Sequence, residues 1–293
     1  MDRGDVIADR FELERVAGSG GMGTVWRARD RRDGGAVAVK VMREHDADQV
    51  RRFVREAELL AELRHPGIVR YVAHGKSTQE MWLAMEWLEG ESLAERLKRQ
   101  GLTLDETLTF ARRCAGALAA AHDGGVIHRD LKPSNLYLVR GSVSEVRLLD
   151  FGIARLREGR RQLTITGSML GTPGYMAPEQ ARGEPTVDAR ADVFAFGCVL
   201  FKCLTGRAVF SGEDGLAVLL RVVLEEAPRV SDLRDDVPPA LDDLVARMLT
   251  KDPAGRPGDG AALLAELDSL GEQRGAAPGA RARPRGSPRP SGA

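Results

Sequence analysis

The stretch "VIHRDLKPSNLYL", residues 126–138, places charged and amide side chains between two apolar flanks. The polar residues are Arg129, Asp130, Lys132 and Asn135. The flanks, residues 126–127 and 136–139, predict two short strands. Because a buried charge without a partner is costly, the polar groups between these strands either satisfy one another or bind a ligand.

The composition is that of an ordinary globular protein. The 293 residues suffice for two lobes, with 43% hydrophobic residues, 29% charged residues and a formal net charge of zero. The most apolar run, residues 193–201, has about half the length that a membrane span needs, so we expect a core helix there. The start lacks the apolar segment of a signal peptide, and three cysteines without metal-like spacing indicate a reducing compartment. We therefore expect a cytoplasmic protein with no nucleic-acid partner and no membrane span.

Strand-like and helical segments divide the chain into two parts. Residues 11–86 have the pattern of strands with a single helix, whereas residues 90–270 are mainly helical. The pattern predicts an α+β fold with a small β-rich lobe and a larger helical lobe, preceded by an N-terminal extension of residues 1–10. Residues 271–293 are rich in Pro, Gly, Ala and Arg, so we expect a disordered tail. It is either a solvated terminus or an electrostatic tether to an acidic partner or membrane surface.

The segment "AGSGGMGTV" holds Gly18, Gly20 and Gly23 in GxGxxG spacing. This spacing alone is a weak signal, because dinucleotide-binding folds share it. Those folds need a helix after the glycines, whereas the residues that follow here are strand-like. The glycines therefore cap a hairpin, which is either an ordinary turn or a flap whose backbone N–H groups approach phosphates.

Lys40 lies in an apolar strand and, if it faces the interior, needs an anionic partner. The helix that follows has an apolar stripe of Phe53, Leu60 and Leu63 at helical spacing. Glu56 falls in this stripe and is the one acid directed at the core. The sequence therefore predicts a Lys40–Glu56 pair, and the alternative is a surface lysine and a surface glutamate.

Two oxygen-bearing side chains lie at the ends of predicted strands. Asn135 precedes one strand, and Asp150 of an Asp-Phe-Gly follows fifteen residues later at the end of another. Together they suit a hard divalent cation such as Mg²⁺. Asp130 is then left to accept a proton from a substrate hydroxyl, and Lys132 to neutralise charge on a moving phosphoryl group. An Asp-Phe-Gly by itself is also a common turn after a strand.

Several motifs in order resemble those of one family. They are "GSGGMG", "VAVK", the helix acid Glu56, "HRDLKPSN", "DFG", "GTPGYMAPE", "DVFAFG" and "DPAGRP". The sequence resembles serine/threonine protein kinases, specifically the bacterial relatives of the eukaryotic enzymes (Hanks-type), over residues 11–270. The resemblance implies a two-lobed protein-kinase-like fold with ATP and Mg²⁺, or Mn²⁺, in the cleft. Lys132 two residues after Asp130, together with Thr172, resembles the serine/threonine pattern.

The resemblance also implies catalytic roles. Lys40 would hold the α- and β-phosphates and pair with Glu56, and Asp150 and Asn135 would hold the metal. Asp130 would orient and deprotonate the substrate hydroxyl. Asp192 would brace the catalytic loop, and Arg256 would form a buried ion pair with Glu179.

The implied nucleotide pocket has Met85 as its gatekeeper, followed by a hinge whose Glu86 and Leu88 backbone groups would contact adenine. Tyr137 stands where most relatives carry Leu, Ile or Met beneath the adenine ring. It is either a tolerated aromatic floor or the cause of a narrower pocket. The implied nucleotide-binding residues are Gly18, Gly20, Gly23, Val25, Ala38, Lys40, Met85, Glu86, Leu88, Asn135, Tyr137 and Asp150.

The resemblance further implies regulation by phosphorylation. Arg129 precedes Asp130 as in kinases that are switched by activation-loop phosphorylation, and Thr164 and Thr166 match the usual bacterial autophosphorylation pair. A phosphate there could dock on Arg129. The resemblance implies protein substrates as partners, and it allows a second copy to bind through the small lobe. The alternatives are a catalytically silent, nucleotide-binding pseudokinase scaffold and a small-molecule kinase.

Overall fold

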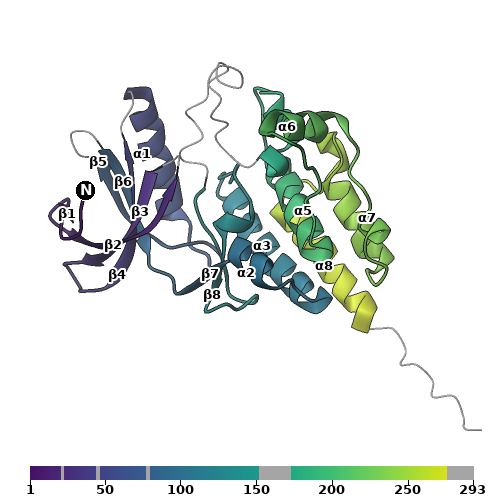
Figure 1. The fold of residues 1–293 in the computed structure, drawn as a ribbon, viewed down its shortest axis with the longest axis horizontal. Coiled ribbons are helices and arrows are strands. Elements are labelled where there is room, and N and C mark those ends of the chain that lie inside the picture. Colours follow the sequence, from purple (N-terminus) through teal and green to yellow (C-terminus); the bar gives the residue numbers. More distant parts are fainter. Residues whose placement is uncertain (21–22, 44–46, 77–79, 152–172, 276–293) are drawn as a thin grey trace, which may run out of the picture.

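A computed structural model describes residues 1–20, 23–43, 47–76, 80–151 and 173–275. Strands gather in the N-terminal lobe and helices in the C-terminal lobe, as the composition of each part predicts (Figure 1). No helix in these described ranges combines the length and the apolar character that crossing a membrane requires.

The small lobe is built on a six-stranded antiparallel sheet in the order β1-β2-β3-β4-β6-β5. The strands are β1 (Val6–Ile7), β2 (Phe11–Gly20), β3 (Gly23–Asp30), β4 (Ala36–Arg43), β5 (Tyr71–Lys76) and β6 (Glu80–Glu86). Side chains alternate between the faces. Val37, Val39 and Val41 of β4 pack with Trp26 on one face, so Ala38 and Lys40 point to the other.

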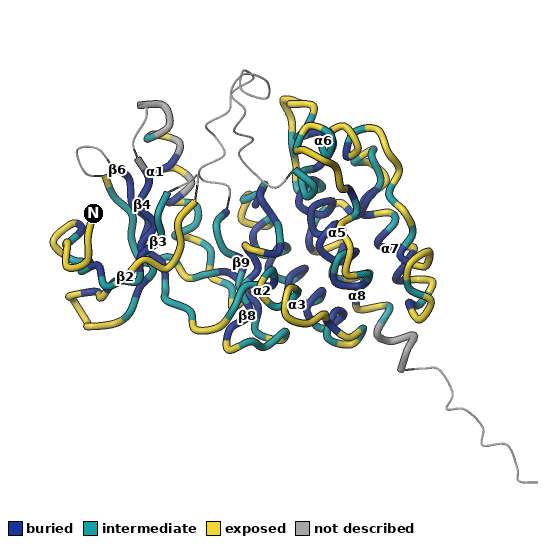
Figure 2. Tube along the Cα trace, viewed as in Figure 1, coloured by how far each residue is buried: buried dark blue, intermediate teal, exposed yellow. Residues whose placement is uncertain are grey.

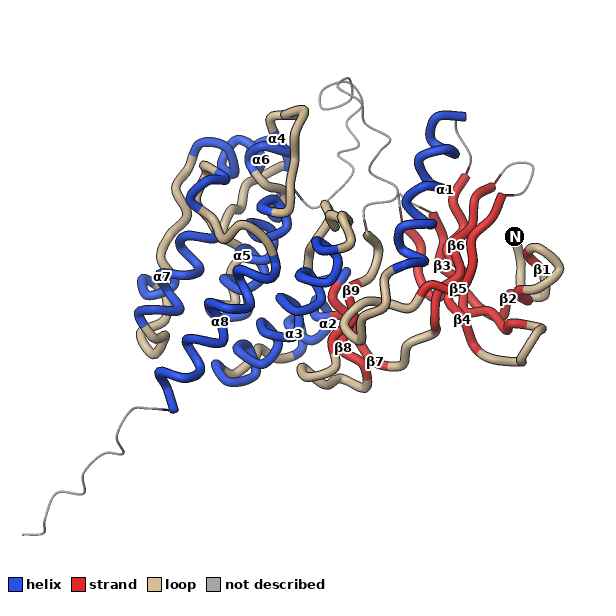
Figure 3. The backbone as a smooth tube through the Cα atoms, turned by 180° about the vertical axis from the view of Figure 1, so that it is seen from behind, coloured by secondary structure: helices blue, strands red, loops and turns tan. Residues whose placement is uncertain are grey.

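That second face carries the helix α1 (Ala47–Glu62). Phe53 and Ala57 of α1 pack against Met42, Leu83 and Met85 of the sheet. Figure 3 shows α1 lying against the sheet. The predicted apolar stripe of this helix therefore holds it beside the strand that carries Lys40.

The large lobe contains a short three-stranded sheet and a set of packed helices. The strands, in the order β7-β8-β9, are β7 (Gly90–Ser92), β8 (Leu136–Val139) and β9 (Val146–Leu148). The helices are α2 (Leu93–Arg99), α3 (Leu104–Asp123), α4 (Pro178–Ala181), α5 (Arg190–Thr205), α6 (Gly215–Leu224), α7 (Pro239–Met248) and α8 (Gly260–Gly275). Helix α5 is apolar on all sides and is buried along most of its length (Figure 2), which confirms a core helix at residues 193–201.

Two local expectations differ from the structure. Residues 126–127 form no strand, whereas residues 136–139 form β8 as predicted. The Val126 N–H closes the end of α3 on the Ala121 carbonyl, and the next amides bind a side chain instead of a neighbouring strand. Residues 1–10 are not a separate extension either, because β1 pairs with β2 and Ile7 is buried in the sheet core.

Candidate active site

Three of the polar residues of the stretch 126–138, namely Asp130, Lys132 and Asn135, bind one another. Lys132 Nζ donates to Asp130 Oδ2 at 2.8 Å, and Asn135 Nδ2 donates to the Asp130 carbonyl at 2.8 Å and to Oδ2 at 3.2 Å. Asp130 is only 6% exposed. Two donors thus hold one buried carboxylate in a fixed orientation, which is the geometry that a positioned proton acceptor needs.

Asp192 of α5 binds the backbone of the stretch 126–138. Its carboxylate accepts the His128 N–H at 2.7 Å and the Arg129 N–H at 2.8 Å, and it is almost fully buried. These bonds hold Arg129 at φ 62°, a left-handed conformation that is unfavourable for a non-glycine residue. The contact predicted between Asp192 and the loop is therefore confirmed.

His122 at the end of α3 completes this brace, and the sequence analysis did not identify it. Its Nδ1 accepts the Gly260 N–H at 3.0 Å, so Nε2 carries the proton and donates to Asp192 Oδ2 at 2.9 Å. This neutral tautomer connects α3, α5 and the start of α8. A histidine in the last turn of an apolar helix, just before the polar stretch 126–138, was the available signal.

His128 packs beneath the segment that contains Asp150. Its Nε2 lies 2.8 Å from the Leu149 carbonyl, and its ring lies 4.6 Å from that of Phe151. Burial lowers the pKa of His128 below its usual value, against the opposing effect of nearby carboxylates such as Asp192. The ring is therefore neutral, and it ties the stretch 126–138 to the Asp-Phe-Gly segment.

Residues from both lobes meet at Asp150. Lys40 Nζ of β4 donates to Asp150 Oδ1 at 2.9 Å, and Lys40 is only 7% exposed. The Leu149 N–H donates to the Asn135 carbonyl at 2.8 Å just beyond the paired strands β8 and β9, so Asp150 follows directly after the residue that binds Asn135. The side chain of Glu56 lies outside the described residues, and the Lys40–Glu56 pair stays a prediction.

The side-chain oxygens of Asn135 and Asp150 are ligand atoms that suit a hard cation. The Asn135 amide nitrogen is committed to Asp130, which leaves its side-chain oxygen, with a long 3.5 Å contact to Ser134 Oγ, as a ligand atom. Asp150 adds a carboxylate. In the described part of the chain, no three acidic, histidine or cysteine side chains cluster as a complete metal cage. Two oxygen ligands with phosphate and water completing the shell match the preference of Mg²⁺.

The glycine-rich segment forms the hairpin that its pattern predicts. Gly20 pairs with Gly23 at the end of β2 and β3, and the two intervening residues lie outside the described ranges. Gly23 has φ 126°, and a Cβ there would lie 2.2 Å from the Val41 carbonyl oxygen, so only glycine fits. A Cβ on Gly18 or Gly20 would meet no protein atom within 4 Å. The backbone at these two positions is thus open to close approach.

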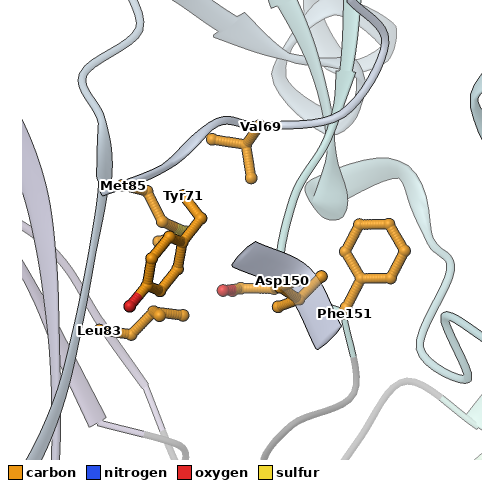
Figure 4. Close-up of a pocket in the computed structure, with 7 residues that line it drawn as sticks. Val69, Tyr71, Leu83, Met85, Asp150 and Phe151 are labelled. Atoms are coloured by element: carbon orange, nitrogen blue, oxygen red, sulfur yellow. The ribbon is translucent and has the colours of Figure 1, made fainter. Parts of the chain in front are cut away.

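The apolar residues predicted for the nucleotide pocket share one face of the sheet. Ala38 lies opposite Met85, and Val25 lies opposite Lys40. Behind Met85 lies a pocket between the lobes, with the Asp150 carboxylate pointing into it (Figure 4). The residues that line this pocket are Leu60, Val69, Tyr71, Leu83, Met85, Asp150 and Phe151.

The hinge segment that follows β6 contacts the hairpin of β2 and β3. The guanidinium groups of Arg15 and Arg27 lie 5.3 and 5.6 Å from the ring centroid of Trp87, within cation–π range. The Trp87 indole N–H also donates to Glu89 Oε1 at 2.7 Å. Trp87 is a second residue whose role the sequence did not reveal, because the contact joins segments that are far apart in the chain.

A buried ion pair stabilises the far side of the large lobe, as predicted. Arg256 donates to the two carboxylate oxygens of Glu179 at 2.7 and 3.0 Å. The predicted phosphorylation sites Thr164 and Thr166 lie outside the described residues, so their regulatory role stays a prediction.

Comparison with known proteins finds relatives along nearly the whole chain. Residues 11–266 match the family described as "Protein kinase domain". "Serine/threonine-protein kinase pkn3" of Myxococcus xanthus is 36% identical over 283 residues, which cover 92% of this chain and 52% of that protein. "Serine/threonine-protein kinase PknJ" of Mycobacterium tuberculosis is 39% identical over 263 residues, which cover 87% of this chain and 44% of that protein. The chain thus spans about half the length of the curated relatives it matches.

Solved structures share the fold. The Mycobacterium tuberculosis PknI kinase domain superposes with a TM-score of 0.73 at 27% identity, covering 92% of this chain and 99% of that one. Rad53 1-466 in complex with AMP-PNP also gives a TM-score of 0.73 at 27% identity, covering 87% of this chain and 64% of that one. These values agree with the sheet and helix arrangement described above.

Proposed function

The chain belongs to the protein kinase domain family, and we propose that it transfers the γ-phosphoryl group of ATP to serine and threonine hydroxyls of proteins. The observation that carries the proposal is the convergence of Asp130, Asn135, Asp150 and Lys40 from two lobes. The relatives named above are serine/threonine-protein kinases, and one structural neighbour is a complex with AMP-PNP, an ATP analogue.

Each residue has a role in this proposal. Asp130 accepts the proton of the substrate hydroxyl, and Lys132 offsets negative charge beside it. Lys40 binds the phosphates, with Glu56 as its expected second partner. The glycines of the hairpin allow backbone N–H groups to approach the same phosphates, and Met85, Glu86 and Leu88 line the adenine site.

Asn135 and Asp150 would hold the divalent metal ion. When bound, Mg²⁺ supplies positive charge that neutralises the phosphates and orients them. The identity of the metal is part of the proposal, and Mn²⁺ has the same preference for oxygen ligands.

The pseudokinase alternative would predict the loss of one of the central residues. Lys40, Asp130, Asn135 and Asp150 are all present and lie together in the structure. The site therefore favours transfer over nucleotide binding alone.

Incubation with γ-labelled ATP and Mg²⁺ tests the function. We expect label on the chain itself and on an added protein substrate, at serine and threonine residues located by mass spectrometry. Lys40→Met, which removes the phosphate-binding cation, is expected to carry no label while it still folds. Label that is absent from the wild type, or equal in both proteins, would contradict the proposal.

We expect the double substitution Thr164→Ala and Thr166→Ala to lower activity several-fold. Phosphate on these residues would add nearly two negative charges each, and it could dock on Arg129 and order the substrate platform. Transfer to an added protein should be compared in the wild type before and after removal of phosphate by a phosphatase. If dephosphorylated wild type is as active as the untreated protein, loop phosphorylation is not a switch.

The proposal also includes a cytoplasmic location and a homodimer. Cys114, Cys198 and Cys203 are free and buried, which suits the reducing cytoplasm. The proposed homodimer through the small lobe would make self-labelling increase more steeply than linearly with protein concentration.

A further inference from the structure

Tyr137 lies on the cleft side of the strand β8. Its neighbours Leu136 and Leu138 are fully buried in the core of the large lobe, so the alternation of the strand directs Tyr137 to the opposite side. There its hydroxyl donates to the Leu88 carbonyl at 3.4 Å, a long hydrogen bond. A side chain from the floor of the cleft thus reaches the hinge.

The direction of this hydrogen bond is fixed. Burial, aided by the carboxylates of Glu95, Glu89 and Glu91, raises the pKa of Tyr137 above its usual value of 10.0. The phenol is therefore protonated at neutral pH. A backbone carbonyl only accepts, so the hydroxyl must be the donor.

The carbonyl of Leu88 is held in place from both sides. The Glu86 N–H donates to the Arg70 carbonyl at 2.9 Å, and the Arg140 N–H donates to the Glu89 carbonyl at 2.8 Å. Trp87 lies between Glu86 and Leu88 in the chain. Its ring contacts Arg15 and Arg27 of the hairpin, and its N–H donates to Glu89. The hinge therefore has little freedom to turn the Leu88 carbonyl away from Tyr137.

In the proposed function, the edge of the adenine ring binds the backbone of Glu86 and Leu88. The atoms along this edge show which part of a purine lies next to the Leu88 carbonyl. If the 6-amino group donates to the Glu86 carbonyl and N1 accepts the Leu88 N–H, the next atom along the base edge is C2. C2 then faces the Leu88 carbonyl. Adenine has only a hydrogen at C2, whereas a 2-amino purine places a donor there that needs this same carbonyl.

We propose that Tyr137 is a specificity-determining residue that selects against purines with an amino group at C2. Its hydroxyl donates to the Leu88 carbonyl, so a 2-amino group has to compete with the phenol for this acceptor. The leucine, isoleucine or methionine expected at this position would leave the carbonyl open. This inference rests on the proposed function, because it requires the nucleotide to bind against the hinge.

Calorimetric binding of two nucleotides tests the proposal. ATP and 2-aminoadenosine 5′-triphosphate, which differ by one amino group, are titrated with Mg²⁺ into the wild type, Tyr137→Phe and Tyr137→Leu. Tyr137→Phe removes only the hydroxyl and keeps the ring. Tyr175→Phe is the matched control, since it removes the hydroxyl of another partly buried tyrosine, one that packs against the core of the large lobe rather than against the hinge.

The readout is the ratio of the two dissociation constants, which a general loss of stability or affinity does not move. We expect Tyr137→Phe to shift this ratio in favour of the 2-amino nucleotide by about 3- to 10-fold, the effect of one neutral hydrogen bond. Tyr137→Leu should shift it in the same direction, and Tyr175→Phe should leave it at the wild-type value. An unchanged ratio in Tyr137→Phe would overturn the inference while leaving the kinase proposal intact. If the wild type bound neither nucleotide, the proposed function itself would fail, and this inference with it.

Discussion

Replacing Asp130 by asparagine is expected to lower phosphoryl transfer by about 10²- to 10⁴-fold, the range that a positioned general base contributes. The carboxylate is buried and held by Lys132 and Asn135, so it is oriented before any substrate arrives. An asparagine fills the same space but has no site of comparable basicity for the proton. Binding of ATP depends on Lys40 and the hairpin, and it should stay nearly unchanged.

Steady-state transfer to a protein substrate and calorimetric binding of ATP separate these two effects. Asp243→Asn is the matched control, because this carboxylate is mostly exposed, pairs with Arg229 and lies on α7. It should transfer phosphate at the wild-type rate. Turnover of Asp130→Asn within a few-fold of the wild type would rule out the assignment of Asp130 as the base. Loss of ATP binding in the same variant would indicate instead that the loop had rearranged.

The parts of the fold that follow local periodicity could be predicted from the sequence. The alternation of residues 36–42 places Lys40 on one face of its strand, and the stripe around Phe53 directs α1 onto that face. The antiparallel pairing of β2 and β3 around the glycines also followed from local pattern. Strand and helix periods act over a few residues, so a single sequence is enough to recognise them.

Contacts between distant segments could not be predicted in the same way. Lys40 and Asp150 are 110 positions apart, and no local pattern joins them. The partner that the sequence predicts for Lys40, Glu56, stays a prediction. His122 and Asp192 are 70 positions apart, and their bond depends on how α3 packs against α5. The same brace explains why residues 126–127 are no strand, because the amides that follow bind the Asp192 carboxylate. Family motifs indicated which residues converge, but not which atoms meet.

Breaking the ion pair of Glu179 and Arg256 is expected to lower the stability of the fold strongly. The guanidinium is fully buried, and its five N–H groups bond to Glu179 and to the carbonyls of three other residues. These carbonyls belong to Thr250, Arg190 and Lys251. Glu179→Gln removes the one negative charge in this arrangement and keeps the size of the side chain. An unpaired buried cation is expected to destabilise the fold by about 3–5 kcal/mol.

Urea unfolding, followed by circular dichroism at pH 7, measures this difference. Glu266→Gln is the matched control, because Glu266 pairs with Arg247 on the surface, where the arginine side chain is 50% exposed. Exposed pairs contribute about 0–1 kcal/mol, so the control should unfold near the wild-type midpoint. Adding Arg256→Met to Glu179→Gln should restore part of the lost stability, since no charge is then left unpaired. Equal losses in Glu179→Gln and Glu266→Gln would show that burial gives this ion pair no special importance. A double variant less stable than Glu179→Gln would place the contribution of Arg256 in its three carbonyl contacts instead of its charge.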